Sequence, residues 1–130
     1  FRVPLPGATE ALDRLRKKGV ILGLLTNGNG PGQRAKIERF DLAVHFAYIG
    51  IEGEVGHGKP HRRAYETALR ALYSEPTTTW MVGDNLQWDV EGAQAAGIRG
   101  IWLDRAGNGL PAGSTVQPDR VIRAIADLLD

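Results

Sequence analysis

Three polar features, each at or near the end of a predicted strand, have the residue types needed to bind a phosphoryl group. The first is Thr26-Asn27-Gly28, which directly follows an apolar run. A threonine hydroxyl and the free backbone N–H groups of a glycine turn suit phosphate oxygens. The simpler interpretation is a plain turn, because Asn-Gly is a common turn pair, and for this feature alone the turn is favoured.

The second feature is Lys59, which lies in Gly58-Lys59-Pro60. A lysine held just before a helix can place a point charge on a phosphoryl group. By itself, Lys59 is better explained as a solvated surface lysine. Its importance therefore depends on the other two features.

The third feature is a pair of carboxylates, Asp84 and Asp89, that follows the apolar residues 80–82. A carboxylate at the end of a buried strand suits Mg²⁺, which takes oxygen ligands and keeps several waters. Gly83 is expected to let the backbone turn there without steric cost. Asp89 has a second interpretation as the N-cap of the next helix, and it can serve both purposes.

The segments between these features have hydrophobic patterns that predict alternating strands and helices. Continuous apolar runs are typical of strands buried on both faces, and apolar residues at helical spacing predict helices. Strands are expected at 20–25, 47–51, 79–82 and 98–103. Helices are expected at 10–18, 33–40, 60–73, 89–96 and 121–129, with loops at 26–32, 52–59, 83–88 and 105–119.

This alternation predicts an α/β fold, with a parallel sheet between two layers of helices, in one domain over residues 1–130. In such sheets, ligands bind beyond the carboxyl ends of the strands. The loops after residues 25 and 82, and the loop after residue 51, are therefore the ones expected to carry a site.

Composition excludes several classes of function. The 16 Lys and Arg residues nearly balance the 15 Asp and Glu residues, giving a net charge of +1. This balance argues against a nucleic-acid or membrane partner. The chain has no cysteine, which excludes disulfides, thiol nucleophiles and Cys-ligated zinc. With no apolar run long enough to cross a membrane, a cytoplasmic location is expected.

Taken together, the three features resemble the motifs of the haloacid dehalogenase-like (HAD) hydrolase superfamily, most closely its cap-bearing phosphatases such as phosphoglycolate phosphatases and nucleotidases. Residues 22–28 (LGLLTNG) look like the second motif, and residues 56–60 (GHGKP) like the lysine motif. Residues 82–89 (VGDNLQWD) look like the fourth motif. The resemblance implies a Rossmann-like core and a Mg²⁺-dependent phosphatase that acts on a small phosphorylated substrate.

The resemblance assigns phosphate binding to Thr26, Asn27, Gly28 and Lys59. The hydroxyl of Thr26 would bond the phosphoryl oxygens, helped by the backbone of Asn27 and Gly28. Lys59 would neutralise the nucleophile and the phosphate. Thr26 and Lys59 are thus the catalytic candidates in this chain.

The resemblance assigns the metal to Asp84 and Asp89. Asp84 would ligate Mg²⁺. Asp89 would support the waters of the metal or pair with Lys59.

The first motif of the family, Asp-x-Asp, occurs nowhere in the chain. In the family, its first Asp attacks phosphorus to form an aspartyl-phosphate and its second acts as general acid and base. Asp13 and Asp104 are not in positions to replace them. Residues 3–7 (VPLPG) resemble the return from a cap into the core. We therefore expect the C-terminal part of such a hydrolase, without the first strand and the cap and inactive alone.

Two other functions stay open at this point. The chain could keep the HAD-like fold without catalysis, as an interaction protein, because it lacks the nucleophile. A dinucleotide-binding module is also considered, because Gly28-x-Gly30-x-Gly32 follows a predicted strand, but it is less favoured. That spacing departs from Gly-x-Gly-x-x-Gly, and no acidic residue ends the following strand.

Overall fold

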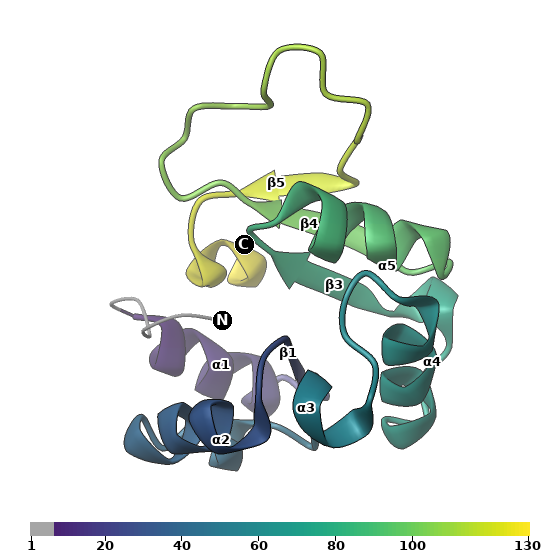
Figure 1. Ribbon diagram of the computed structural model, residues 1–130. Helices are drawn as coiled ribbons and strands as arrows, with labels where there is room; N and C mark the ends of the chain where they lie inside the picture. Colours follow the sequence, from purple (N-terminus) through teal and green to yellow (C-terminus); the bar gives the residue numbers. More distant parts are fainter. Residues whose placement is uncertain (1–6) are drawn as a thin grey trace.

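The strands form two parallel sheets in the computed structural model, which describes residues 7–130 (Figure 1). The first sheet pairs β1 (Gly23–Thr26) with β2 (Tyr48–Ile51). The second has the order β3 (Trp80–Gly83), β4 (Arg99–Leu103), β5 (Arg120–Ile122). The predicted α/β class with parallel strands is confirmed.

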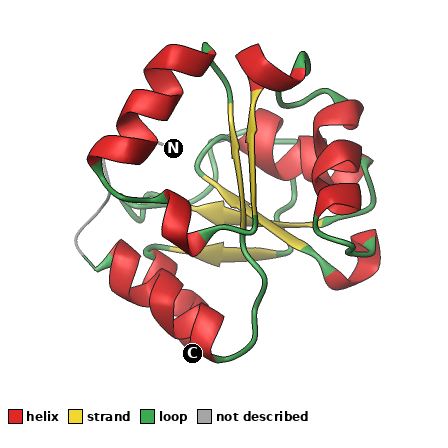
Figure 2. Cartoon of the chain, turned by 90° about the horizontal axis from the view of Figure 1, so that it is seen from below, coloured by secondary structure: helices red, strands yellow, loops and turns green. Residues whose placement is uncertain are grey.

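Helices surround the strands (Figure 2). In the described part of the chain, none is long and apolar enough to cross a membrane. The α-helices are α1 (Ala8–Lys17), α2 (Gly30–Arg39), α3 (Glu52–Val55), α4 (Arg62–Ala71) and α5 (Gly92–Ala95). Three 3₁₀ helices, η1 (Ala43–His45), η2 (Pro76–Thr78) and η4 (Ile125–Leu129), and one π-helix, η3 (Leu86–Glu91), complete the set.

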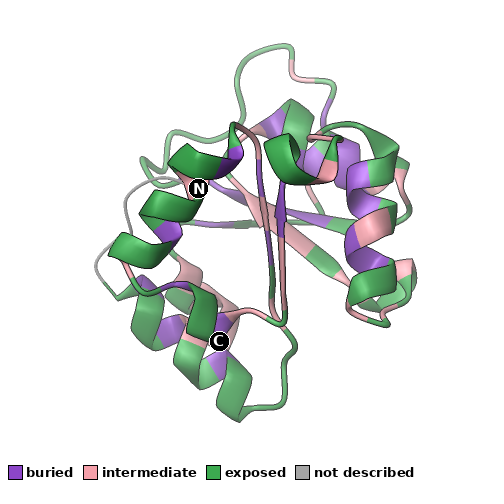
Figure 3. Cartoon of the chain, turned by 60° about the horizontal axis from the view of Figure 1, so that its bottom comes forward, coloured by how far each residue is buried: buried purple, intermediate pink, exposed green. Residues whose placement is uncertain are grey.

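Helix α4 joins the two sheets through a shared apolar cluster. Its buried Tyr65 and Leu69, at helical spacing, pack with Ala93 and Ile98. Leu25 of β1 and Met81 of β3 pack against this same cluster. Figure 3 shows the resulting pattern, in which helices carry buried residues on one side and exposed residues on the other. The sheets are thus held together by side chains.

No backbone ladder joins the two sheets within residues 7–130. β1 pairs along one edge with β2, and β3 pairs along one edge with β4. The other edge of each strand has no strand partner among the described residues. Unpaired N–H and C=O groups at such an edge can accept a further strand.

The predicted C-terminal helix over 121–129 is wrong at its start, where residues 120–122 form β5 instead. Hydrogen bonds next to this segment hold it against β4. The Asp119 carboxylate accepts from the Gly100 amide and from Gln94, which together lower the pKa of Asp119, the amide contributing most. Ile122 is then buried against Ile101 and Leu103. The 3₁₀ helix η4 follows.

Smaller differences occur at other predicted elements. The ladder of β1 begins at Gly23, and the preceding Val20 and Ile21 are 44% and 62% exposed. The predicted loop 52–59 contains the short helix α3, and the predicted helix 89–96 is replaced by η3 and α5. Residues 3–6 of the expected return from a cap lie outside the described residues.

The role of α4 predicts that Leu69→Ala destabilises the whole chain. Leu69 is 8% exposed in the cluster that joins the sheets, so its truncation should lower the free energy of unfolding by about 2–5 kcal/mol. Leu110→Ala is the matched control, because Leu110 is 38% exposed and should change stability by under about 0.5 kcal/mol. Urea unfolding of both variants measures this. Equal losses would contradict the bridging role.

Candidate active site

Thr26 and Gly28 shape the loop that follows β1. Thr26 ends the strand and is 5% exposed, with its hydroxyl donating to the Asn27 carbonyl over 3.3 Å. Gly28 has a φ of 119°, a conformation that favours glycine. The predicted loop 26–32 is shorter in the structure, where it covers residues 27–29, because α2 already begins at Gly30. It follows a strand end, where ligands of parallel sheets bind.

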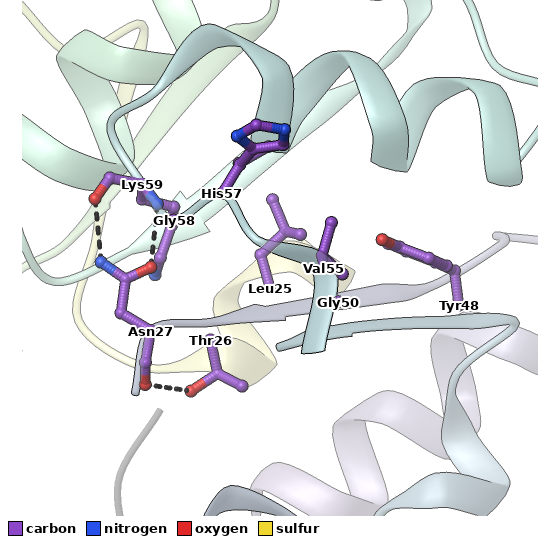
Figure 4. A pocket seen from close by; sticks show the side chains of 10 residues that line it. Leu25, Thr26, Asn27, Tyr48, Gly50, Val55, His57, Gly58 and Lys59 are labelled. Atoms are coloured by element: carbon purple, nitrogen blue, oxygen red, sulfur yellow. Dashed lines mark hydrogen bonds between the residues drawn. The ribbon is translucent and has the colours of Figure 1, made fainter. Parts of the chain in front are cut away.

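The side chain of Asn27 fastens this loop to Lys59. Its Nδ2 donates to the Lys59 carbonyl over 2.8 Å, and its Oδ1 accepts from the Lys59 amide over 2.8 Å (Figure 4). The sequence predicted a role for the backbone of Asn27 but missed this use of the amide side chain. As a result, two motifs 32 residues apart lie side by side.

Lys59 forms a buried ion pair with Asp89. Lys59 Nζ lies 2.7 Å from Asp89 Oδ1, and the two side chains are 10% and 5% exposed. Asp89 Oδ2 accepts from the Asn85 amide over 3.1 Å. Each oxygen of Asp89 is therefore engaged within the protein. Asp89 was expected either to support the waters of the metal or to pair with Lys59. The structure shows the pairing with Lys59.

The turn that carries Asp89 is a π-helix capped by another residue. The side chain of Asn85 accepts from the amides of Gln87 and Trp88 over 3.1 and 2.8 Å. The interpretation of Asp89 as a helix N-cap is therefore wrong, because Asn85 fills that position. Single-turn π-helices are frequent at functional sites.

Tyr65 of α4 supports this turn from the protein interior. Its hydroxyl donates to the carbonyl of Trp88 and, over 3.4 Å, to that of Asp89. Burial, followed by the nearby Asp89 charge, raises the pKa of Tyr65 far above its usual range, so the hydroxyl stays a donor. The same residue thus joins the two sheets and fixes the position of the Asp89 backbone.

Gly83 is required for a reason different from the one predicted. It does not have the left-handed backbone that only glycine adopts easily. Instead, the Asp89 carboxylate lies so close that a Cβ at this position would overlap it. Glycine therefore makes room for the carboxylate of the ion pair.

Asp84, the expected metal ligand, lies at the carboxyl end of β3 with its side chain 49% exposed. Its backbone carbonyl accepts from the indole of Trp102 over 3.1 Å. Within residues 7–130, no group of three or more His, Cys, Asp or Glu side chains could hold a metal ion. Mg²⁺ sites need as few as one protein carboxylate, with waters and substrate phosphate completing the shell, so Asp84 fits a weak site.

The Gly28 amide, expected to be free for phosphate, donates to Glu52 Oε1 over 3.0 Å. The sequence did not predict this contact. A cavity of about 10 Å³ lies nearby, lined in part by Thr26, Asn27 and Lys59 (Figure 4). It has room for about one water molecule and is far too small for a substrate. This cavity therefore cannot enclose a substrate.

Comparison with known proteins relates this chain to hydrolases. Residues 1–97 match the model of the family described as haloacid dehalogenase-like hydrolase. The phosphoserine phosphatase of Thermus thermophilus is 48% identical over 105 residues, which are 80% of this chain and 42% of that protein. The glyceraldehyde 3-phosphate phosphatase of Pyrococcus furiosus is 38% identical over 99 residues, 76% of this chain and 41% of that protein.

The solved structures agree with this relationship. The crystal structure of a HAD phosphatase from Thermococcus onnurineus superimposes with a TM-score of 0.85 at 29% identity. The match covers 95% of this chain and 55% of that chain. This chain therefore spans roughly half the length of the proteins that it matches.

The two hydrogen bonds from the Asn27 side chain to the Lys59 backbone, here called the Asn27 clamp, are lost in Asn27→Ala. This variant should therefore have a free energy of unfolding lower by about 1–3 kcal/mol. Asn27→Asp keeps the shape but replaces the donor with an acceptor facing a carbonyl, so it should cost at least as much. Asn108→Ala, in an exposed loop, is the control. Urea unfolding that finds Asn27→Asp as stable as the wild type would contradict the clamp.

Proposed function

This chain belongs to the haloacid dehalogenase-like hydrolase family, and from that membership we propose that it is the phosphate- and metal-binding part of a Mg²⁺-dependent phosphomonoester hydrolase. The observation that carries the proposal is the convergence of three sequence motifs. Asn27 fastens the loop after β1 to Lys59, and Lys59 pairs with Asp89 in the turn after β3. The polar groups of all three motifs therefore gather at the carboxyl ends of β1 and β3.

In this proposal, Thr26 and Lys59 hold the phosphoryl group. The Thr26 hydroxyl and the backbone amides of Asn27 and Gly28 donate hydrogen bonds to its oxygens. For Gly28, phosphate must first displace the carboxylate of Glu52. Lys59, held by its contacts with Asn27 and Asp89, offsets the negative charge of the phosphate and of the nucleophile.

Asp84 is the proposed ligand of Mg²⁺. Bound there, the cation would offset the charge of the phosphoryl oxygens during transfer. Asp89 contributes indirectly, because its carboxylate fixes Lys59 and the Asn85 amide. It thereby sets the shape of the loop that begins with Asp84.

The proposed nucleophile is an aspartate of the longer parent protein. The chain contains no Asp-x-Asp, and it spans only 42% and 41% of the phosphoserine and glyceraldehyde 3-phosphate phosphatases named above. In the parent, this aspartate would attack phosphorus, release the alcohol and form an aspartyl-phosphate that water then hydrolyses. The edges of β1 and β3 that have no strand partner within residues 7–130 support a strand between them that delivers this residue to the same sheet edge.

The proposed substrate is a small phosphorylated metabolite. The two relatives are named for phosphoserine and for glyceraldehyde 3-phosphate, both small phosphomonoesters. The near-neutral charge of this chain gives no broad basic surface for a polyanion. A panel of small phosphomonoesters is therefore the appropriate screen.

The proposal predicts that the 130-residue chain does not turn over p-nitrophenyl phosphate with Mg²⁺, whereas a chain extended at its N-terminus by the first strand and cap does. Without a positioned carboxylate, the remaining groups only orient and neutralise the phosphoryl group, so the rates should differ by at least about a thousandfold. Initial rates with p-nitrophenyl phosphate, phosphoserine and glyceraldehyde 3-phosphate measure this, and melting curves should show the extended chain to be more stable.

Two variants of the extended chain serve as controls. One is Asp84→Ala, and the other replaces the nucleophilic Asp with Asn. Both should lose turnover. Turnover by the 130-residue chain that Asp84→Ala abolishes would place the nucleophile inside this chain and contradict the proposal. An extended chain that folds but lacks activity on the whole panel would favour the non-catalytic alternative. A dinucleotide-binding role is not supported by the family of this chain.

A further inference from the structure

Arg105 is a cation that the sequence motifs did not include, and it lies beside the proposed metal ligand. β3 and β4 are parallel neighbours with Gly83 opposite Trp102, so the residues just after each strand meet at one edge of the sheet. A guanidinium nitrogen of Arg105 lies 3.6 Å from Asp84 Oδ2. The side chains of Arg105 and Asp84 are 36% and 49% exposed.

This position conflicts with a metal ion on the same carboxylate oxygen. Mg²⁺ binds oxygen at about 2.0–2.1 Å and keeps a shell of waters beyond that distance. A guanidinium 3.6 Å from Oδ2 lies within the volume of that shell, and its charge repels the dication. Binding through Oδ2 therefore requires the Arg105 side chain to move away.

We propose that Arg105 is a resident counter-ion that competes with Mg²⁺ for Asp84 and thereby sets the metal affinity of the site, an inference that rests on the proposed metal role of Asp84. Without metal, the guanidinium partly neutralises a carboxylate that would otherwise stand uncompensated. With metal, the side chain swings into solvent.

The contrast with Lys59 and Asp89 explains why Arg105 can exchange and Lys59 cannot. The Lys59–Asp89 pair is buried and 2.7 Å apart, and separating it would leave two charges away from water. The Arg105–Asp84 pair is half-exposed and longer, so water solvates both groups when they separate. One pair is therefore suited to hold the site in place and the other to give way to a ligand.

Calorimetric titration of the 130-residue chain with Mg²⁺ tests the proposal. Arg105→Gln should bind Mg²⁺ about three- to tenfold more tightly than the wild type, because both the competing ion pair and the repulsion are gone. Arg105→Lys keeps the charge and should stay close to the wild type. Arg70→Gln removes the same charge from the exposed face of α4 and should change the affinity much less.

Asp84→Asn in the Arg105→Gln background separates the two proposals. Loss of binding in this double variant, together with the gain in Arg105→Gln, supports both. An unchanged or weaker Mg²⁺ affinity in Arg105→Gln, with binding still lost in Asp84→Asn, overturns the competition and leaves the metal site standing. No Mg²⁺ binding by either the wild type or Arg105→Gln overturns both. Weaker binding of inorganic phosphate by Arg105→Gln, with Mg²⁺ affinity unchanged, would make Arg105 a phosphate ligand instead.

Discussion

The arrangement of the site depends on the buried ion pair between Lys59 and Asp89. Lys59 is held at the end of the first sheet, because the side chain of Asn27, just after β1, bonds its backbone. Asp89 lies in the turn after β3 of the second sheet. In the described part of the chain, the two sheets share no backbone ladder, so this pair and the α4 cluster are what align their carboxyl ends. A buried ion pair often stabilises a protein no better than apolar residues would, but removing one partner is costly. Stability alone therefore does not explain why charges occupy this position, whereas the proposed phosphoryl site would.

The polar groups of the site have partners within the described part of the chain. Asp89 is paired with Lys59, Asp84 faces Arg105, and the Gly28 amide donates to Glu52. These three contacts differ in burial, and burial decides which of them can yield. The Lys59–Asp89 pair is held on both sides by further hydrogen bonds, whereas the contacts of Asp84 and Gly28 are open to solvent. The site thus combines a buried, fixed interior with solvent-exposed outer contacts, which are the ones proposed to give way to ligands.

The family and the fold class were predictable from the sequence because they depend on local patterns. Apolar runs that lead to Thr26 and Asp84, and the glycine-rich segment before Lys59, give the motifs. The family comparisons confirmed the resemblance. The contacts that assemble the motifs were not predictable, since the Asn27 clamp and the approach of Asp89 to Gly83 depend on residues distant in sequence. The sequence pattern over 121–129 predicts a helix, because the three-residue strand β5 is too short to show alternating apolar and polar residues. Only its pairing with β4 distinguishes it.

Lys59 and Asp89 act as one unit that holds the two halves of the site together. A double-mutant cycle with Lys59→Met, Asp89→Asn and the double variant, measured by urea unfolding, tests this claim directly. Each single change leaves a buried polar or charged partner unsatisfied, so each should cost about 3–5 kcal/mol, and the double variant should recover at least about 2 kcal/mol of their sum. Additive losses, within about 0.5 kcal/mol, would show that the two residues do not depend on each other and would contradict the account.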